Sequence, residues 1–498
     1  MKKRMIVFSL VVLLLLLAGC DNSSGPDVNA LPPLETAPSD SNNNEQDFNR
    51  GDPIVIYQEN LSCGVSFELY EDGKLVLSGG DITISMGDEK AFQDYQDSIV
   101  SIELGEGVTS IEDKAFAGLA KVQKLIVGDS VTSIGYSAFS DCTALTQVSF
   151  GEALEEIGDY AFSGCTALTD VNLGGNIANV GSYCFANCTT LKNAILGESI
   201  TKMGNCIFSG CTNLSSLRIK CNVSDSAFKD CTSLESVVFE DTVEVIGDRA
   251  FSGCTSLQNI TLSQNLTKIG AYAFSDCITI GSITVPASVN SIGKEAFAKC
   301  AKLDTVQFSE NATLTLGDSA FIGCTALKDI DLNDGIVAIG QYCFADCTAL
   351  MSATIGCNVQ EMGESLFSGC TVLTEVEINS SVGEASFKNF STLEQVTFGE
   401  TVIVIGAQGF YGCNAIQEVV LPEGVETIEE RAFYNCSGIK KITLPKTLKS
   451  IGDEILYGTD SLDDIYYRGS SGDWSSINKG KKWSSGAGIT YVTKHNAK

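Results

Sequence analysis

One short pattern of residues returns along most of the chain, and it limits the possible folds more than any other feature. It places a phenylalanine, usually after an alanine, at nearly constant intervals: Phe116, Phe139, Phe162, Phe185, Phe208, Phe228, Phe251, Phe274, Phe297, Phe321, Phe344, Phe367, Phe387, Phe410 and Phe433. Nearly every step is 23 residues, with one step of 24 and two of 20. A period in this range is typical of a solenoid, in which each unit packs against its neighbours.

Each repeat predicts a short strand, a turn and a short helical piece. In one unit, Val148 and Phe150 are apolar and alternate with polar neighbours, which predicts a strand with one buried face. Ile157, Ala161 and Cys165 are four residues apart, which is helical spacing. No single unit can bury its apolar edge alone, whereas stacked units bury a continuous core.

The repeated segments resemble the leucine-rich repeat class, and within it the bacterial BspA-like, treponemal type. The matching segments are the leucine of "CTAL", the strand "LTQVSF", the "VTSIG" segment and the "AFSGC" segment. The resemblance covers about residues 101–465. It implies an α/β repeat fold, namely a right-handed leucine-rich repeat solenoid of about 16 coils with short strands on its concave face.

The segments on either side of the repeats also resemble parts of such proteins. "FELYEDGKLVLSGGD" resembles a β-rich cap, so residues 53–100 are expected to form an N-terminal cap. "IYYRGSSGDWSSI" resembles the unit that closes such arrays, so residues 466–498 are expected to form a small C-terminal cap and tail. Caps are physically required, because end coils would otherwise expose the core and the strand edges.

A larger repeat lies within the small one. The two short steps run from Phe208 to Phe228 and from Phe367 to Phe387, so the second reproduces the first at an offset of 159 in the numbering. This spacing indicates that a block of seven coils was duplicated. Because three residues are missing from each short coil, we expect the array to be tighter or kinked there.

Residues 1–52 predict export and anchoring. Residues 1–19 combine a basic start with a short apolar run, as in a secretory signal. The run ends in "LAGC", which resembles the signal of bacterial lipoproteins and implies cleavage before Cys20 and lipidation of that cysteine. The alternative is a plain secretory signal that carries a cysteine. Lipid on Cys20 would anchor the protein to a membrane.

Residues 20–52 are rich in Asn, Ser, Asp and Pro, which predicts a flexible tether. This tether ends in Arg50-Gly51-Asp52, the tripeptide that integrins recognise in some adhesive proteins. Pro53 restricts the conformation of Asp52, and so short a motif also occurs by chance. We therefore favour a spacer role for these residues.

Thirteen of the 20 cysteines follow a repeat phenylalanine by three residues. Cysteines stacked in successive coils would point in parallel, which is poor geometry for a disulfide. Leu119 and Phe390 occupy the same position, so it accepts a bulky apolar group. A ladder of small buried hydrophobic side chains explains both facts, with disulfides and metal binding as the alternatives.

The composition argues against several functions. The formal net charge of −30 disfavours binding to nucleic acid and to anionic lipid headgroups. The single histidine, His495, lies in the tail, so the repeats hold no Ser–His or Cys–His pair. No phosphate-binding glycine loop or calcium loop of the usual spacing occurs. We therefore expect neither catalytic residues nor a cofactor or resident metal.

The outward face of the predicted strands is the natural binding surface of a solenoid. Alternation along the strands places these candidate binding residues there: Asp170, Asn172, Asn193, Arg218, Asn259, Asp329, Asp331, Glu375 and Glu377. The face is mostly small and polar, and aromatic anchors are absent from it. The four acidic residues of the face, Asp329, Asp331, Glu375 and Glu377, suggest a basic partner or loosely held calcium. The alternative is a hydrated face without a ligand.

The resemblance implies a function in adhesion, with proteins of the host matrix or of neighbouring cells as partners. The expected location is the bacterial cell envelope, with the repeats at the cell surface. A structural or scaffold role in the envelope without a dedicated ligand is the alternative. Saturable binding to a defined partner would distinguish adhesion from a scaffold, and catalytic turnover would contradict both.

Overall fold

The computed structural model describes residues 53–60, 64–82, 95–310 and 313–487, together with the backbone of residues 494–495. The predicted signal sequence, Cys20, the tether and the Arg50-Gly51-Asp52 tripeptide lie outside the described residues. The predictions made for them therefore stay predictions.

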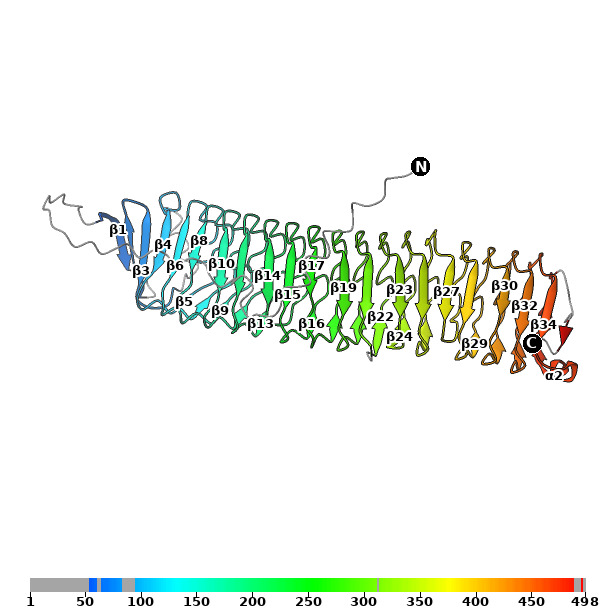
Figure 1. Ribbon diagram of the computed structural model, residues 1–498. Helices are drawn as coiled ribbons and strands as arrows, with labels where there is room; N and C mark the ends of the chain where they lie inside the picture. Colours follow the sequence, from blue (N-terminus) through cyan, green and yellow to red (C-terminus); the bar gives the residue numbers. More distant parts are fainter. Residues whose placement is uncertain (1–52, 61–63, 83–94, 311–312, 488–493, 496–498) are drawn as a thin grey trace, which may run out of the picture. The chain divides into compact units, whose positions relative to one another are not determined.

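Residues 101–467 form a stack of about 17 coils, one more than the sequence predicted (Figure 1). Each coil contributes one longer strand to a row of parallel strands. These longer strands are β4 (Ser101–Leu104), β6 (Lys124–Val127), β8 (Gln147–Ser149), β10 (Asp170–Leu173), β12 (Asn193–Leu196), β14 (Ser216–Ile219), β15 (Ser236–Phe239), β17 (Asn259–Thr261), β19 (Ser282–Val285), β21 (Thr305–Phe308), β23 (Asp329–Leu332), β25 (Ser352–Ile355), β27 (Glu375–Ile378), β28 (Gln395–Phe398), β30 (Glu418–Val420), β32 (Lys441–Leu444) and β34 (Asp464–Tyr467).

A second row of shorter parallel strands runs beside the first, and the sequence did not predict it. These strands are β5 (Ser110–Ile111), β7 (Ser133–Ile134), β9 (Glu156–Ile157), β11 (Asn179–Val180), β13 (Lys202–Met203), β16 (Val245–Ile246), β18 (Lys268–Ile269), β20 (Ser291–Ile292), β22 (Leu314–Leu316), β24 (Ile336–Ile339), β26 (Glu361–Met362), β29 (Val404–Ile405), β31 (Thr427–Ile428), β33 (Ser450–Ile451) and β35 (Asn478–Lys479). In the two short coils a single bridging residue, Val223 or Val382, replaces the strand. The missing residues are thus removed from the connection between the two rows.

The predicted helical piece in each repeat is wrong. Between the shorter strand and the next longer strand the chain makes consecutive turns, and the one α-helix in the described residues is α2 (Ser471–Ser476). Ser137 and Asp141 show the reason, because both have positive φ, at 52° and 58°. A right-handed helix requires negative φ at every residue. The fold is therefore a β-solenoid made mostly of strands rather than an α/β repeat.

The turns are held by hydrogen bonds to the next coil. In one pair of coils the N–H groups of Ser137, Phe139 and Asp141 donate to carbonyls of the coil that follows, at 2.8, 2.8 and 2.7 Å. These bonds satisfy backbone groups that a helix would have paired internally. We call this set of three bonds the turn ladder. It recurs with the same spacing in most coils.

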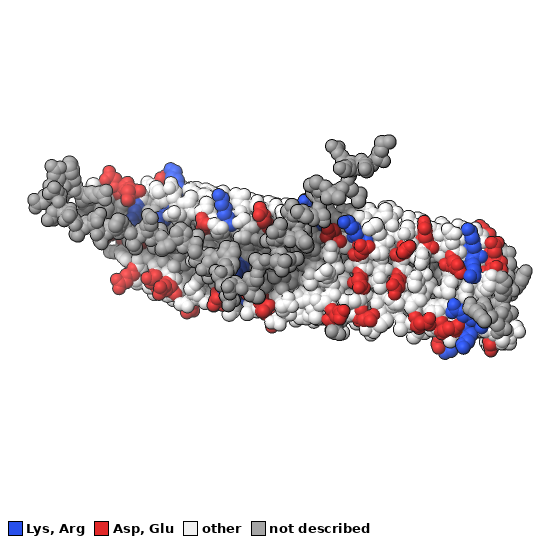
Figure 2. All heavy atoms as spheres, in the orientation of Figure 1, with Lys and Arg blue, Asp and Glu red and all other residues white. Residues whose placement is uncertain are grey.

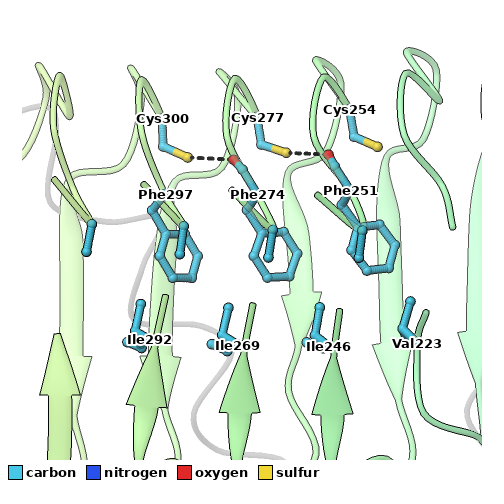
Figure 3. Close-up of a cluster of buried hydrophobic side chains, with 14 of the residues drawn as sticks. Val223, Ile246, Phe251, Cys254, Ile269, Phe274, Cys277, Ile292, Phe297 and Cys300 are labelled. Carbon is cyan, nitrogen blue, oxygen red and sulfur yellow. Dashed lines mark hydrogen bonds between the residues drawn. The ribbon is translucent and has the colours of Figure 1, made fainter. Parts of the chain in front are cut away.

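The phenylalanines form a continuous stack in the interior. Phe251 and Phe274 are typical, with ring centroids 5.3 Å apart and ring planes 5° apart. A column of aliphatic side chains from the shorter strands, including Ile269 and Ile292, lies below the rings (Figure 3). The stack places like residues above like residues, as the repeat predicted.

The cysteines form a second column in the interior. Cys277 Sγ lies 3.1 Å from the carbonyl oxygen of Phe251, and Cys300 Sγ lies 3.3 Å from that of Phe274 (Figure 3). All thirteen repeat cysteines contact the phenylalanine carbonyl of the preceding coil in this way. Every cysteine in the described residues is free. The prediction of a buried ladder is confirmed, and the thiol additionally serves as a hydrogen-bond donor.

Glycines allow close stacking beside the shorter strands. Gly135, Gly158, Gly181 and Gly204 occupy equivalent positions in four successive coils. A Cβ on Gly158 would lie 2.8 Å from the carbonyl carbon of Gly135, which is closer than real side chains approach backbone. The stacking distance therefore depends on the absence of a side chain at these positions.

Different strands flank the repeated coils. At one end β1 (Val55–Asn60), β2 (Ser66–Tyr70) and β3 (Lys74–Ser78) pair antiparallel, and β3 then pairs parallel with β4. At the other end β34 pairs with β36 (Lys494–His495), and β35 continues the row of shorter strands. A capping box between Ser470 and Asp473 starts α2.

Candidate functional site

The outward face of the longer strands carries the predicted binding residues. All nine lie on these strands at exposed positions, whereas their immediate neighbours along the strand point inward. In β10, for example, Asp170 and Asn172 are exposed, and Val171 and Leu173 are buried. We call this surface the strand face. The alternation in the sequence therefore located the face correctly.

The four acidic residues of the face form two separate pairs rather than one cluster. Asp329 and Asp331 lie on β23, Glu375 and Glu377 lie on β27, and β25 runs between them. Strands at the usual spacing therefore put the pairs about 10 Å apart. In the described residues, no three or more His, Cys, Asp or Glu side chains are grouped as a metal site would require. This arrangement gives no support to a calcium site.

Two of these four carboxylates already accept a hydrogen bond from a neighbouring side chain. Ser352 Oγ donates to Asp329 Oδ1 at 2.6 Å, and Asn379 Nδ2 donates to Glu377 Oε1 at 3.0 Å. Acidic side chains are also spread over much of the visible surface, with basic side chains gathered in fewer places (Figure 2). The acidic pairs are therefore part of a generally negative surface.

Two exposed aliphatic side chains flank Arg218, a basic residue of the face, and sequence reasoning missed both. Ile195 on β12 is 45% exposed and Val238 on β15 is 37% exposed. Arg218 on β14 pairs in register with Val238, and Ile195 lies one repeat period before Arg218. Arg218 also forms an ion pair with Glu240. Arginine is enriched in protein interfaces, and the core of an interface is more apolar than the surface around it.

The signal for this patch was present in the sequence. The outward positions of most strands hold Asn, Ser, Thr, Asp or Gln, and Ile195 and Val238 depart from that pattern. A search for outward positions that break the polar rule would have found them. We call Ile195, Arg218 and Val238 the central patch.

A groove crosses the strand face further along the stack. It lies at one of the interruptions in the hydrogen-bonded pairing of the longer strands, between β28 and β30. The groove has a volume of about 460 Å³, and residues of both strands line it, including Gln395, Thr397, Glu418 and Val420. Val420 is 42% exposed. The groove is a second place where a partner's side chain would find an apolar contact.

Aromatic residues also gather on the turns. Tyr411, Tyr434 and Tyr457 stack with ring centroids 5.0 and 4.7 Å apart. Lys388 Nζ lies 5.3 Å from the centroid of Tyr411, at the free end of this stack. The regular spacing of the tyrosines was visible in the sequence. Because the rings cover one another's faces, we assign them a role in stability rather than in ligand contact.

The geometry defines a leucine-rich repeat solenoid with a long polar strand face. The sequence profile of the family described as BspA type Leucine rich repeat region matches in six copies, over residues 87–215, 221–316, 311–386 and 378–477. The chain therefore belongs to the BspA-type leucine-rich repeat family. Membership of this family of surface proteins indicates a role in protein interaction.

Solved structures of bacterial leucine-rich repeat proteins resemble the chain. A leucine-rich repeat protein from Bacteroides ovatus is 25% identical with a TM-score of 0.51, over 83% of this chain and 94% of that one. A leucine rich cell surface protein from Faecalibacterium prausnitzii is 21% identical with a TM-score of 0.32, over 85% and 97%. A comparison with curated protein sequences found no significant match.

Within the ranges that the structure describes, no helix has the length and apolar character needed to cross a bilayer.

Proposed function

We propose that this protein binds proteins of the host matrix or of neighbouring cells through the strand face, while a lipid on Cys20 anchors it to the bacterial envelope. The observation that carries the proposal is the central patch, in which Ile195 and Val238 are exposed on either side of Arg218. Exposed aliphatic side chains around an arginine supply the apolar contact and the hydrogen bonds that a protein partner uses.

The size of the face suggests how a partner would bind. One longer strand offers an area of about 13 Å by about 4.8 Å. A typical interface covers about 800 Å² on each partner. A partner would therefore span many coils at once or extend onto the turns, and the groove at Val420 is a natural second contact.

Anchoring rests on the sequence of residues 1–52. A lipid on Cys20 and the tether of residues 20–52 would hold the solenoid away from the membrane. The large negative charge keeps so exposed a protein soluble.

Protease treatment of intact cells tests the location. Loss of the repeats under conditions that leave periplasmic proteins intact is the expected result. Repeats that stay intact until the envelope is broken would contradict an adhesive function and favour the structural role in the envelope. Labelling with a radioactive fatty acid, compared between the natural chain and Cys20→Ser, tests the anchor separately.

Saturation binding to a panel of purified matrix and cell-surface proteins tests the strand face. We expect the double variant Ile195→Ser, Val238→Ser to raise the Kd for a bound partner at least tenfold. Both side chains are exposed, so the substitutions remove little core packing and folding should be kept. Ile403→Ser, an exposed change off the longer strands, is the matched control. Equal Kd values for both variants would exclude the central patch.

A further inference from the structure

The two short coils are copies of one another, yet they stack differently. In the first, Phe208 and Phe228 have ring centroids 5.5 Å apart and ring planes 9° apart. In the second, Phe367 and Phe387 are 6.0 Å and 25° apart. The ring stack is therefore less regular at the second short coil than at the first.

The turn ladder differs in the same place. In the first copy the N–H groups of Cys206, Phe208 and Gly210 donate to the next coil at 2.9, 2.8 and 2.8 Å. In the second copy the bonds shift by one residue, so that Leu366 donates to the carbonyl of Ser386 at 3.0 Å. The N–H groups of Phe367 and Gly369 then have no acceptor among the described residues.

One of the substitutions between the copies places a larger side chain at this interface. Position 231 of the first copy is a cysteine whose thiol contacts the carbonyl oxygen of Phe208 at 3.3 Å. The equivalent position of the second copy is Phe390, whose ring lies against Phe367 with centroids 6.4 Å apart. The larger side chain thus lies at the place where the turn ladder is incomplete.

A cavity of about 310 Å³ lies between the turns of these two coils. Its size is at the lower end of the range for small-molecule sites, about 300–1,000 Å³. Its lining includes Phe367 and Gly369 with their free N–H groups, Phe390, and the hydroxyl-bearing residues Ser368 and Ser391. No carboxylate belongs to the lining.

The polar groups of the cavity favour a neutral amide over an anion. The backbone carbonyl of Lys388 faces no donor among the described residues, so the cavity offers an acceptor as well as donors. The ammonium group of Lys388 is engaged elsewhere, because it donates to Gln408 Oε1 at 2.8 Å. The carboxylate of Asp346 lies next to Gly369, where it would repel a negative charge. A secondary amide presents both a carbonyl and an N–H, and the methyl group of an acetamide suits the ring of Phe390.

We propose that this cavity binds the acetamido group of an N-acetylated amino sugar. The amide would pair with the free backbone groups, and the sugar hydroxyls would meet the serine and threonine side chains at the rim. The inference does not depend on the proposed adhesive role, because the cavity is lined by turn residues and not by the strand face.

Saturation-transfer NMR on the full chain tests the proposal, with N-acetylglucosamine at millimolar concentration as the probe. We expect strong transfer to the acetyl methyl group and to ring protons, and none to glucose, which lacks the amide. Phe390→Cys, which restores the residue of the first copy, should reduce the transfer at least fivefold. Ser391→Tyr, which blocks the exposed rim, should do the same without altering the core.

Thr232→Tyr, the equivalent change at the first short coil, is the matched control and should leave the transfer unchanged. Circular dichroism on each variant reports whether it has folded. Absence of transfer with the natural chain would overturn the proposal, as would equal transfer in both tyrosine variants. Equal saturation of N-methylacetamide, with no transfer to the sugar ring, would show an amide site and overturn the assignment to a sugar.

Discussion

At the scale of single residues, the repeat cysteines combine packing with hydrogen bonding. Burial raises the pKa of the Cys142 thiol to about 12, so the group stays protonated and can donate to the carbonyl of Phe116. The sequence predicted the burial, because Leu119 and Phe390 occupy the same position. It could not predict the donor role, since that depends on a carbonyl of the preceding coil.

Thiol reactivity should separate the buried column from exposed cysteines. Cys357 is the exposed cysteine of the described residues, and its alkylation by iodoacetamide at pH 8 should precede that of every repeat cysteine. A hydrogen bond to Asp334 raises the pKa of Cys357, so even this reaction will be slow. Peptide mapping before and after denaturation measures the order. A repeat cysteine found in a disulfide would contradict the ladder.

The raised thiol pKa values also predict a loss of stability in alkali. In the unfolded chain the thiols ionise near pH 9, whereas the folded pKa of Cys142 and of Cys324 is about 12. Stability is therefore complete below about pH 9 and falls as the pH rises toward 12. Within that window, each such thiol lowers the free energy of unfolding by about 1.4 kcal/mol for every pH unit.

Denaturant unfolding at pH 8 and pH 10 measures this fall. The double variant Cys142→Ala, Cys324→Ala should be less stable at pH 8 and should lose less on going to pH 10. An equal loss in the natural chain and the variant would assign the effect to other groups, such as the tyrosines.

At the scale of elements, periodicity located the strands and misled about the turns. Alternation in β10 and its counterparts gave the correct inward and outward faces. The four-residue spacing of Ile157, Ala161 and Cys165 also brings all three inside, but through turns with positive φ rather than through a helix. The spacing of apolar residues thus indicates which side chains are buried, but it does not determine the backbone conformation that buries them.

Positive φ at one turn position can be tested directly. Lys299 has φ of 59° where most coils have Gly, Asp or Asn. Lys299→Gly should therefore raise the free energy of unfolding by about 1 kcal/mol, because glycine adopts this conformation without strain. Lys302→Gly, an exposed lysine in the same coil without positive φ, should lower it. A decrease in both variants would show that the strain is negligible.

The glycine column limits the stacking distance of the coils. A Cβ on Gly181 would collide with the backbone of Gly158 and Asp159, so Gly181→Ala should lower stability by about 1–3 kcal/mol. Gly281→Ala adds a Cβ with no atom within 4 Å and should change stability little. Thermal unfolding of the two variants decides whether the close approach matters.

At the scale of the whole molecule, the step lengths alone predicted the number of coils within one. The duplicated block that they also indicate stays a prediction. They could not predict that the two short coils would differ in the packing of their turns, where Phe390 lies against Phe367 in the second coil alone. The phenylalanine stack shows no tightening at either short coil, because the ring centroids are 5.5 Å apart at the first and 6.0 Å apart at the second, against 5.3 Å between Phe251 and Phe274.

This difference should make the second short coil the weakest point of the stack. We expect the amides of Phe367 and Gly369 to exchange with deuterium faster than those of Phe208 and Gly210, whose hydrogen bonds are intact. Exchange measured by mass spectrometry on peptides from the two copies makes the comparison within one sample. Equal rates would show that the open ladder does not lower local stability.

The constant register between neighbouring coils has a consequence for how such a gene can change. In both copies of the block, neighbouring strands pair in the same parallel register. Copying or deleting one whole block would therefore leave only interfaces of a type that the stack already contains. Unequal recombination can therefore alter the reach of the protein without a new packing solution. A duplicated block also leaves one copy to maintain the stack while the other accumulates change, and Phe390 in place of a cysteine is such a change.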